Sequence, residues 1–306
     1  MAVKNAFPPA LGLKLPLAWR EDQAHGKLPA LSGDAYSFLR GCGFDFVEFA
    51  TAACADQGEL ALLRRETAAC RQAGLSVALH PYLWGACNPA EFGQRPECAR
   101  ALHAVLRAAS TAAELSAAPV TVILHAAEAR CEPAGAALSP FRTELLERSR
   151  LFFAEAERRV AASHPGVLVT AEHQLPSHAG EPVIRIGDTC AELLDTVAGT
   201  ALGLCWDTGH YRLGVERYGQ PEPPSAEFLR RVRHVHLHDV VGGADHRVIG
   251  PQSARVRGYV ALLQRSAFTG TITLEYALDA IQSAGGLEKV AREAPGILAA
   301  WRVSAQ

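Results

Sequence analysis

The sequence predicts an α/β protein that folds as a single (β/α)8 TIM barrel. Short runs rich in Val, Ile, Leu and Thr alternate along the whole chain with longer segments rich in Ala, Leu, Glu and Arg. Eight such runs can be recognised, and strands that alternate with helices pair in parallel through right-handed crossovers. The chain of 306 residues is also long enough for the roughly 250 residues of one barrel.

Each expected strand is a short apolar run bounded by loop residues. The eight are Leu11–Leu17, Phe44–Phe49, Leu75–His80, Val120–His125, Val167–Glu172, Leu202–Asp207, His234–His238 and Thr271–Glu275. The expected helices are Glu59–Ala73, Pro96–Leu115, Pro140–Ala162, Cys190–Val197, Ala226–Val232, Arg257–Ser266 and Gly286–Arg302. Eight units favour a closed barrel over an open doubly wound sheet. The chain also has no G-x-G-x-x-G after the first strand and no Walker loop, which disfavours a nucleotide-binding sheet.

No break in composition and no long linker divides the chain, so we expect residues 1–306 to form one barrel domain. Three segments rich in Gly, Pro and polar residues follow strand ends, where barrel enzymes place their active-site loops. They are Ala126–Ser139, Gln174–Asp188 and Tyr218–Ser225.

The composition is that of an ordinary globular protein, with 49% hydrophobic and 20% charged residues. The net charge of −2 disfavours binding to nucleic-acid phosphates, and no apolar run approaches the ~18 residues of a transmembrane helix. Lysines and prolines interrupt Met1–Arg20, which makes it a poor signal peptide. The eight cysteines form no CxxC pair, so we expect reduced thiols in a cytoplasmic protein without membrane association.

Ionisable residues stand at the ends of the expected strands. They are Glu48, His80, His125, Glu172, Asp207, His236 and Glu275. Because successive strand residues point to opposite faces, Ile272 and Leu274 share the outer face of the last strand and Glu275 points into the barrel mouth. Carboxylates and imidazoles that converge in one cavity destabilise it unless a cation compensates them, and a divalent metal ion does so for all of them at once.

The other histidines have separate interpretations. His210 lies three residues after Asp207, so both side chains face the same ion or substrate. His234 is expected to be a hydrogen-bonded residue of the barrel interior, and His238 a loop residue or a support for a ligand. The histidines expected at the solvated surface are His25, His103 and His164.

Five short segments carry a family resemblance: Val167–Glu172, Cys205–His210, Val235–Asp239, His246–Gly250 and Ile272–Tyr276. Together they resemble the xylose-isomerase-like TIM-barrel superfamily. That superfamily includes sugar phosphate isomerases and epimerases, inosose dehydratases, and endonuclease IV among the family 2 AP endonucleases. The match runs in the expected order from about Phe44 to Tyr276.

The resemblance implies a set of site residues. One divalent ion (Mn, Mg, Co or Zn) would be bound by Glu172, Asp207, His236 and Glu275. Glu172 and Glu275 would also be the catalytic acid and base on opposite faces of the substrate. The residues expected to bind substrate are His80, His125, His210 and His246. The last of these stands where the epimerases often carry an arginine.

The chemistry is coherent with these residue types. A metal ion chelated by a carbonyl oxygen and the adjacent hydroxyl acidifies the α-carbon proton and stabilises an enediolate. One carboxylate removes the proton, and the other returns it to the opposite face or to the neighbouring carbon. We therefore expect a metal-dependent isomerase or epimerase of carbohydrate metabolism that acts on a small sugar or polyol-type α-hydroxycarbonyl substrate. Trp19, Tyr82 and Trp84 are either core residues or an apolar wall for a sugar ring.

Other classes stay open. An endonuclease IV-like phosphodiester hydrolase uses three metal ions, and this chain has a counterpart for all but one of the ligands. The exception is an Asp two residues before the last His, where the chain has Ala244, with Asp245 one residue out of step. A lyase like inosose dehydratase, a non-catalytic barrel and a homo-oligomer also stay open. The near-neutral charge favours a small sugar-like partner over nucleic acid.

Overall fold

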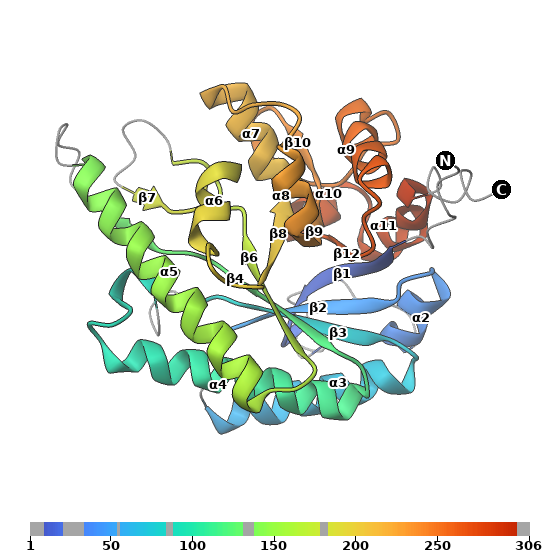
Figure 1. The fold of residues 1–306 in the computed structure, drawn as a ribbon. Helices are drawn as coiled ribbons and strands as arrows, with labels where there is room; N and C mark the ends of the chain where they lie inside the picture. The colour runs from blue at the N-terminus through green and yellow to red at the C-terminus, as the bar shows by residue number, and fades with distance from the viewer. Residues whose placement is uncertain are drawn as a thin grey trace.

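A computed structural model describes residues 9–20, 34–53, 56–83, 88–130, 138–177 and 183–298 of the chain. The barrel strands are β1 (Ala10–Pro16), β2 (Phe46–Thr51), β3 (Ser76–Pro81), β4 (Val120–Leu124), β6 (Val167–Glu172), β8 (Gly203–Asp207), β9 (Val232–Leu237) and β12 (Thr271–Leu274). They form one closed barrel in the order β1-β12-β9-β8-β6-β4-β3-β2, and every neighbouring pair is parallel (Figure 1). This confirms the (β/α)8 barrel that the sequence predicts.

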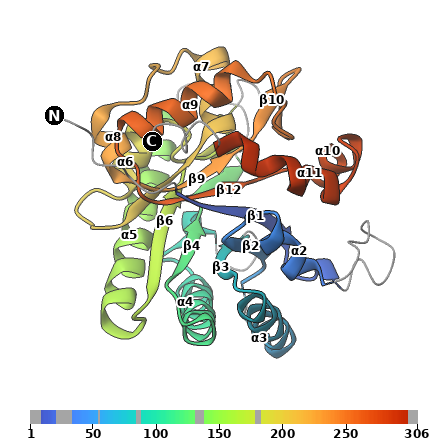
Figure 2. The ribbon, with the colours of Figure 1, turned by 90° about the vertical axis from the view of Figure 1, so that its right-hand side faces the viewer.

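Helices follow the strands on the outside. They are α2 (Ala35–Gly41), α3 (Gln57–Gln72), α4 (Pro96–Ser116), α5 (Leu138–Ser163), α6 (Cys190–Thr196), α7 (Thr208–Tyr218), α8 (Ala226–Arg231), α9 (Ala254–Arg265), α10 (Leu278–Ser283) and α11 (Leu287–Glu293). Short 3₁₀ turns cover Pro89–Glu91 and Ala294–Leu298. Figure 2 shows α3, α4 and α5 side by side along the strands that they cover. None of the helices in the described residues combines the length and apolar character that a membrane crossing requires.

Every expected strand and helix overlaps an observed one, but three helices were not expected. These are α2, α7 and α10. The expected helix Gly286–Arg302 is wrong in its second half. It changes to a 3₁₀ turn at Ala294, next to Pro295, whose ring cannot supply the N–H that an α-helix needs. Residues 299–302 lie outside the described part of the chain.

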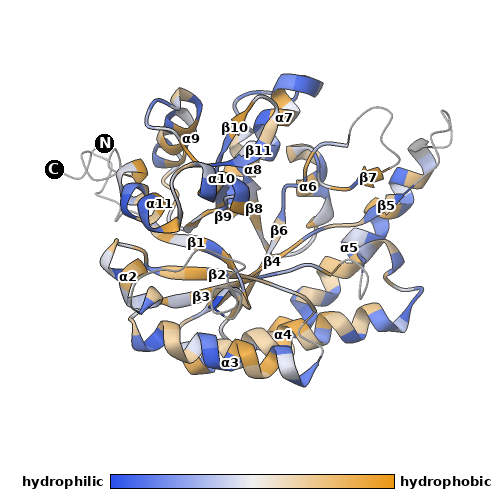
Figure 3. Ribbon diagram, turned by 180° about the vertical axis from the view of Figure 1, so that it is seen from behind, coloured by the Kyte–Doolittle hydropathy of each residue, from blue (hydrophilic) through white to orange (hydrophobic). Residues whose placement is uncertain are grey.

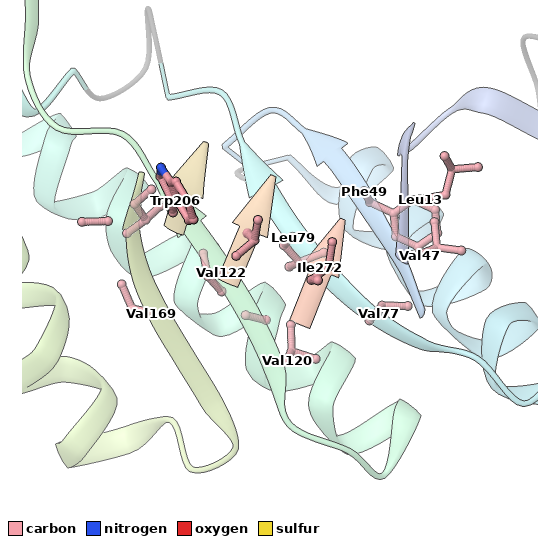
Figure 4. Packing of buried hydrophobic residues seen from close by; sticks show 14 of the residues in the cluster. Leu13, Val47, Phe49, Val77, Leu79, Val120, Val122, Val169, Trp206 and Ile272 are labelled. Carbon is pink, nitrogen blue, oxygen red and sulfur yellow. The ribbon is translucent and has the colours of Figure 1, made fainter. Parts of the chain in front are cut away.

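The hydrophobic core lies between the barrel and the helices. Figure 4 shows Leu13, Val47, Leu79, Val122 and Trp206 on five strands of the barrel, all fully or almost fully buried. They occupy the outward-facing positions that the two-residue period of a strand predicts. Figure 3 shows hydrophobic colour along β2, β8 and β9 and hydrophilic colour on α10. Burial of this outer face leaves the inward-facing positions free to carry polar groups.

A second, small apolar cluster fills the inside of the barrel. It consists of Phe46, Ala78, Ile123 and Cys205. Gly12 on β1 makes room for it, because a Cβ atom there would lie 2.2 Å from the Phe46 ring. The polar residues of the site therefore stand on an apolar floor.

Two small antiparallel sheets of two strands stand among the loops that follow the barrel strands. One pairs β5 (Glu128–Arg130) with β7 (Val183–Arg185), and the other is a hairpin of β10 (Asp239–Val241) and β11 (Ala244–Arg247). The first sheet joins two segments that were expected to be active-site loops. The second was not expected.

Candidate metal centre

The four expected metal ligands lie together. One donor atom each from Glu172, Asp207, His236 and Glu275 can be chosen so that all of them lie within 4.8 Å of one another. His236 Nδ1 is 3.2 Å from Glu172 Oε1 and 2.6 Å from Glu275 Oε2. It lies 3.9 Å from Asp207 Oδ2. All four side chains are buried, and they come from the ends of four barrel strands.

Register explains why they meet. His236 on β9 pairs with Asp207 on β8 and with Thr273 on β12, so all three stand at the same height in the barrel. Glu275 follows Thr273 by two residues and points to the same side. Glu172 is the last residue of β6, the neighbour of β8. Parallel strands thus bring their carboxyl ends to one mouth.

The donor set fits a divalent cation. Glu275 Oε2 is buried, and His236 Nδ1 lies 2.6 Å from it. Three carboxylates in one buried cavity are costly unless cations compensate their charge. Atoms that bind one ion at ~2.0–2.3 Å stand about 3–3.5 Å apart, close to the separations around His236. Carboxylates with one imidazole suit Mn, Mg, Co or Zn.

Acidic and basic side chains of the cavity stabilise one another in their charged forms. Burial by itself would raise the pKa of Glu172 and Glu275, but neighbouring cationic groups hold the pKa of both well below the ordinary value. His80 is the strongest of these neighbours for Glu172, and His236 for Glu275. Burial opposes the charged form of His236, yet the acidic groups around it hold its pKa well above the usual value. Ionised carboxylates are the state that a metal ion needs.

Glu48 supports His236 from below. It was expected among the strand ends, but β2 continues to Thr51 and Glu48 is fully buried inside the barrel. Its Oε1 lies 3.1 Å from His236 Nε2, and its Oε2 accepts from Thr273 Oγ1 at 2.7 Å. A carboxylate behind one ring nitrogen directs the other nitrogen at a metal. Glu48 therefore orients His236 so that Nδ1 faces the centre.

Asp207 has two tasks. Its Oδ1 accepts the backbone N–H of His210 at 2.7 Å and so caps the first turn of α7. The same oxygen lies 3.0 Å from His238 Nε2, and the imidazoles of His210 and His238 lower the pKa of Asp207 to about 2. His238 thus stands behind a ligand, one of its two expected positions. His210 faces the same side as Asp207, as the spacing predicts.

Two further donor sets flank the four ligands. Glu172 Oε2 lies 2.9 Å from His80 Nε2 and 2.8 Å from His125 Nε2. This oxygen accepts no aligned hydrogen bond in the part of the chain that is described. The other set consists of Asp207, His210, His238 and His246.

Asp245 reaches the second of these sets, which was not expected from the sequence. Its carboxylate lies 3.6 Å from His210 Nε2 and 3.2 Å from His246 Nδ1. His246 has a φ of +52°, a left-handed conformation that is uncommon outside glycine. The hairpin that contains both residues therefore brings Asp245 to the site. In the sequence, Asp245 stands one residue after the position at which the endonuclease IV pattern has its aspartate.

A pocket of about 170 Å³ opens beside the centre. It is lined by His80, Tyr82, His125, Glu172, Gln174, Leu175, Arg185, His210, Asp245, His246 and Glu275. All four histidines expected to bind substrate are among them. Glu172 and Glu275 belong both to this lining and to the metal set, whereas Asp207 and His236 lie behind it.

The structure decides two open expectations about aromatic residues and corrects one about a histidine. Trp19 is fully buried and donates to Tyr36 Oη at 3.0 Å, so it is a core residue. Tyr82 is 42% exposed, lines the pocket and stacks on His80. Trp84 and His25 lie outside the described residues. His164 was expected at the surface but is only 5% exposed, because it follows the end of α5 where that helix turns in toward β6.

Several proteins of known structure are similar in fold to this chain. D-tagatose 3-epimerase-like protein is similar in structure, with a TM-score of 0.63 and 16% identity over 97% of this chain and 98% of that one. D-psicose 3-epimerase from Clostridium cellulolyticum H10 is also similar, with a TM-score of 0.59 and 13% identity over 97% of this chain and 99% of that one. Endonuclease IV from Thermus thermophilus gives a TM-score of 0.54 and 19% identity over 96% and 99%.

At these identities the structural likeness establishes the fold alone. No curated protein matches the sequence at a significant level. The model of one family, described as xylose isomerase-like TIM barrel, matches residues 37–301, which is most of the chain. The chain therefore belongs to the xylose isomerase-like TIM barrel family.

Proposed function

We propose that the protein is a metal-dependent isomerase or epimerase of a small sugar or polyol-type α-hydroxycarbonyl compound. One observation carries the proposal: Glu172 and Glu275 each reach the metal set and also line the pocket. Two carboxylates that face one substrate from different strands are what a proton transfer between two positions requires. The structurally similar proteins named for D-tagatose and D-psicose 3-epimerase are in keeping with this class.

The residues that would hold the ion are Glu172, Asp207, His236 and Glu275. When bound, a divalent ion supplies a Lewis acid that polarises a carbonyl group and makes the neighbouring C–H more acidic. Glu172 has one oxygen toward His236, while its Oε2 lies near His80 and His125, and the residue lines the pocket. Glu172 would therefore accept the proton of the substrate through a carboxylate oxygen that faces the pocket side.

Glu275 would return the proton. It follows β12, which is separated from β6 by β9 and β8 in the barrel, so the two glutamates approach the pocket from different sides. Return to the opposite face of the same carbon gives epimerisation, and return to the neighbouring carbon gives isomerisation. His125, His210 and His246 line the pocket and would hydrogen-bond substrate hydroxyls.

The test is solvent exchange. The purified protein is loaded with Mn, Mg, Co or Zn and incubated in deuterated water with a panel of ketohexoses, ketopentoses and inososes. We expect deuterium at the α-carbon of at least one substrate, and a new epimer or isomer of equal mass in ordinary water. Treatment with a chelator should abolish both. A product that has lost one water would identify a lyase instead, and absence of exchange and turnover across the panel would contradict the proposal.

A second candidate is a multi-metal phosphodiester hydrolase. It is favoured by the two donor sets beside the main centre and by the position of Asp245, which supplies a carboxylate that the sequence pattern lacks. Cleavage of a duplex oligonucleotide with one abasic site, by protein that holds more than one ion per chain, would support it. We place it second because both glutamates of the main centre face a small pocket.

A further inference from the structure

Lys14 enters the site from β1, the strand from which no ligand was expected. It is buried, and its register partner is Glu48. Its ammonium donates to Glu275 Oε1 and lies 2.6 Å from His80 Nδ1. It also lies 5.1 Å from the centre of the Tyr82 ring. The salt bridge to Glu275 keeps this side chain charged and fixed in place.

The contact with His80 determines where the imidazole carries its proton. An ammonium group only donates hydrogen bonds, so Nδ1 of His80 must accept, and the proton of the neutral ring is on Nε2. Glu48 Oε1 is also near this Nδ1, but at 3.3 Å, farther than the lysine. His80 Nε2 lies 2.9 Å from Glu172 Oε2 and 3.1 Å from His125 Nε2. A nitrogen that carries a proton has no lone pair for a metal ion.

His236, which belongs to the metal set, shows the opposite arrangement. A histidine that binds metal almost always donates its second ring N–H to a carboxylate, a carbonyl or water. His236 has Glu48 behind it. His80 has a cation at the corresponding position. That positive charge also lies one imidazole ring away from the place where a second ion would bind, and like charges repel at such range.

We propose that Lys14 excludes a divalent ion from the set formed by His80, His125 and Glu172, and so limits the site to one resident ion. This inference rests on the proposed single-ion function and deepens it. With no ion at this set, hydroxyl groups of a substrate can approach Glu172, His80 and His125, which line the pocket. Lys14 thereby separates a sugar-type site from a multi-metal hydrolase built on nearly the same ligands.

The experiment counts metal ions. Wild type, Lys14→Met and Lys14→Met/His125→Ala are stripped, reloaded with zinc or cobalt and dialysed, and the metal per chain is measured by elemental analysis. We expect one ion in wild type, close to two in Lys14→Met, and one again in the double variant. The cobalt-loaded Lys14→Met protein should gain a second set of visible absorption bands. Lys14→Arg keeps the charge and should remain at one ion, as should Lys289→Met, which removes a lysine of α11 outside the site.

Two outcomes would overturn the proposal. One is a folded Lys14→Met protein, judged by circular dichroism, that still binds a single ion. The other is wild type with two ions that loses one on His80→Ala. The latter variant decides the question even if Lys14→Met does not fold, because the proposal expects His80→Ala to keep its one ion. Failure of solvent exchange with one ion per chain would remove the proposed function and leave the inference about Lys14 standing.

Discussion

The side chain of Asp207 accepts the backbone N–H of His210 at 2.7 Å, so the residue that caps α7 is also a member of the metal set. Strand β8 ends at Asp207 and α7 begins at Thr208, with no loop between them. The position of the carboxylate is therefore fixed by helix geometry as well as by the strand. A helix cap is a rigid way to hold a ligand.

This double role predicts a graded response. Asp207→Ala should lower the free energy of unfolding of the metal-free protein by about 1 kcal/mol, the usual cost of a lost cap, and should also weaken metal binding. Asp207→Asn keeps a cap oxygen and should lose less stability, with weakened metal binding as well. The matched control is Thr189→Ala, which removes the cap of α6 and should change stability but not metal affinity. Urea unfolding measures the stability of each variant, and metal titration measures its metal affinity. Equal stability of the two Asp207 variants would contradict the role of Asp207 as a helix cap.

Glu48 should control metal affinity without touching the ion. Because it orients His236 through Nε2, Glu48→Gln is expected to reduce metal affinity by about 10–100-fold. Competition with a chromophoric chelator gives the affinity. Glu66→Gln is the control, because Glu66 is equally buried but accepts from Tyr36 Oη in a different part of the fold. A Glu48 variant with wild-type affinity would show that His236 needs no support.

The two pocket glutamates should be needed for proton transfer. Glu172→Gln and Glu275→Gln keep an oxygen of similar shape but remove a usable base. Each should slow α-proton exchange by about 10²–10⁴-fold in protein whose metal content has been confirmed. Exchange at the wild-type rate in both metal-loaded variants would rule out this role.

His210 should act on substrate rather than on the ion. His210→Ala is expected to raise KM while metal stoichiometry stays at one per chain, since its ring borders the pocket. Elemental analysis of the wild type and of the variant gives the number of metal ions per chain, and steady-state kinetics gives KM. If the wild-type content exceeds one ion and the variant loses one, His210 is a metal ligand and the hydrolase gains support.

His164 predicts a pH dependence of stability. Burial, with a contribution from His103, lowers the pKa of His164 below its ordinary value of 6.5. The unfolded chain therefore binds a proton more readily, and this group destabilises the fold increasingly as pH falls through 6.5. His164→Leu should become more stable relative to wild type at about pH 5 than at about pH 7.5, as measured by urea unfolding at both. A difference that does not change with pH would contradict the assignment.

The barrel and most of its site could be predicted because both follow from local pattern. The two-residue period fixes which strand residues face inward, and the last inward residue of a parallel strand reaches the mouth, as Glu172 and Glu275 do. Asp245 could not be placed this way, because its position depends on a left-handed residue in a short hairpin. Lys14 could not be predicted, because a lone lysine in a strand indicates no function until its partners are known. These partners, His80 on β3 and Glu275 just after β12, are distant in the sequence.

The apolar floor formed by Phe46, Ala78, Ile123 and Cys205 fills the interior of the barrel beside the polar site, so that the site faces one end of the barrel. In the proposed enzyme, the ion, the substrate and the product would pass through the same mouth of the barrel. A bound substrate would then stand between the ion and the solvent and should slow removal of the ion by a chelator.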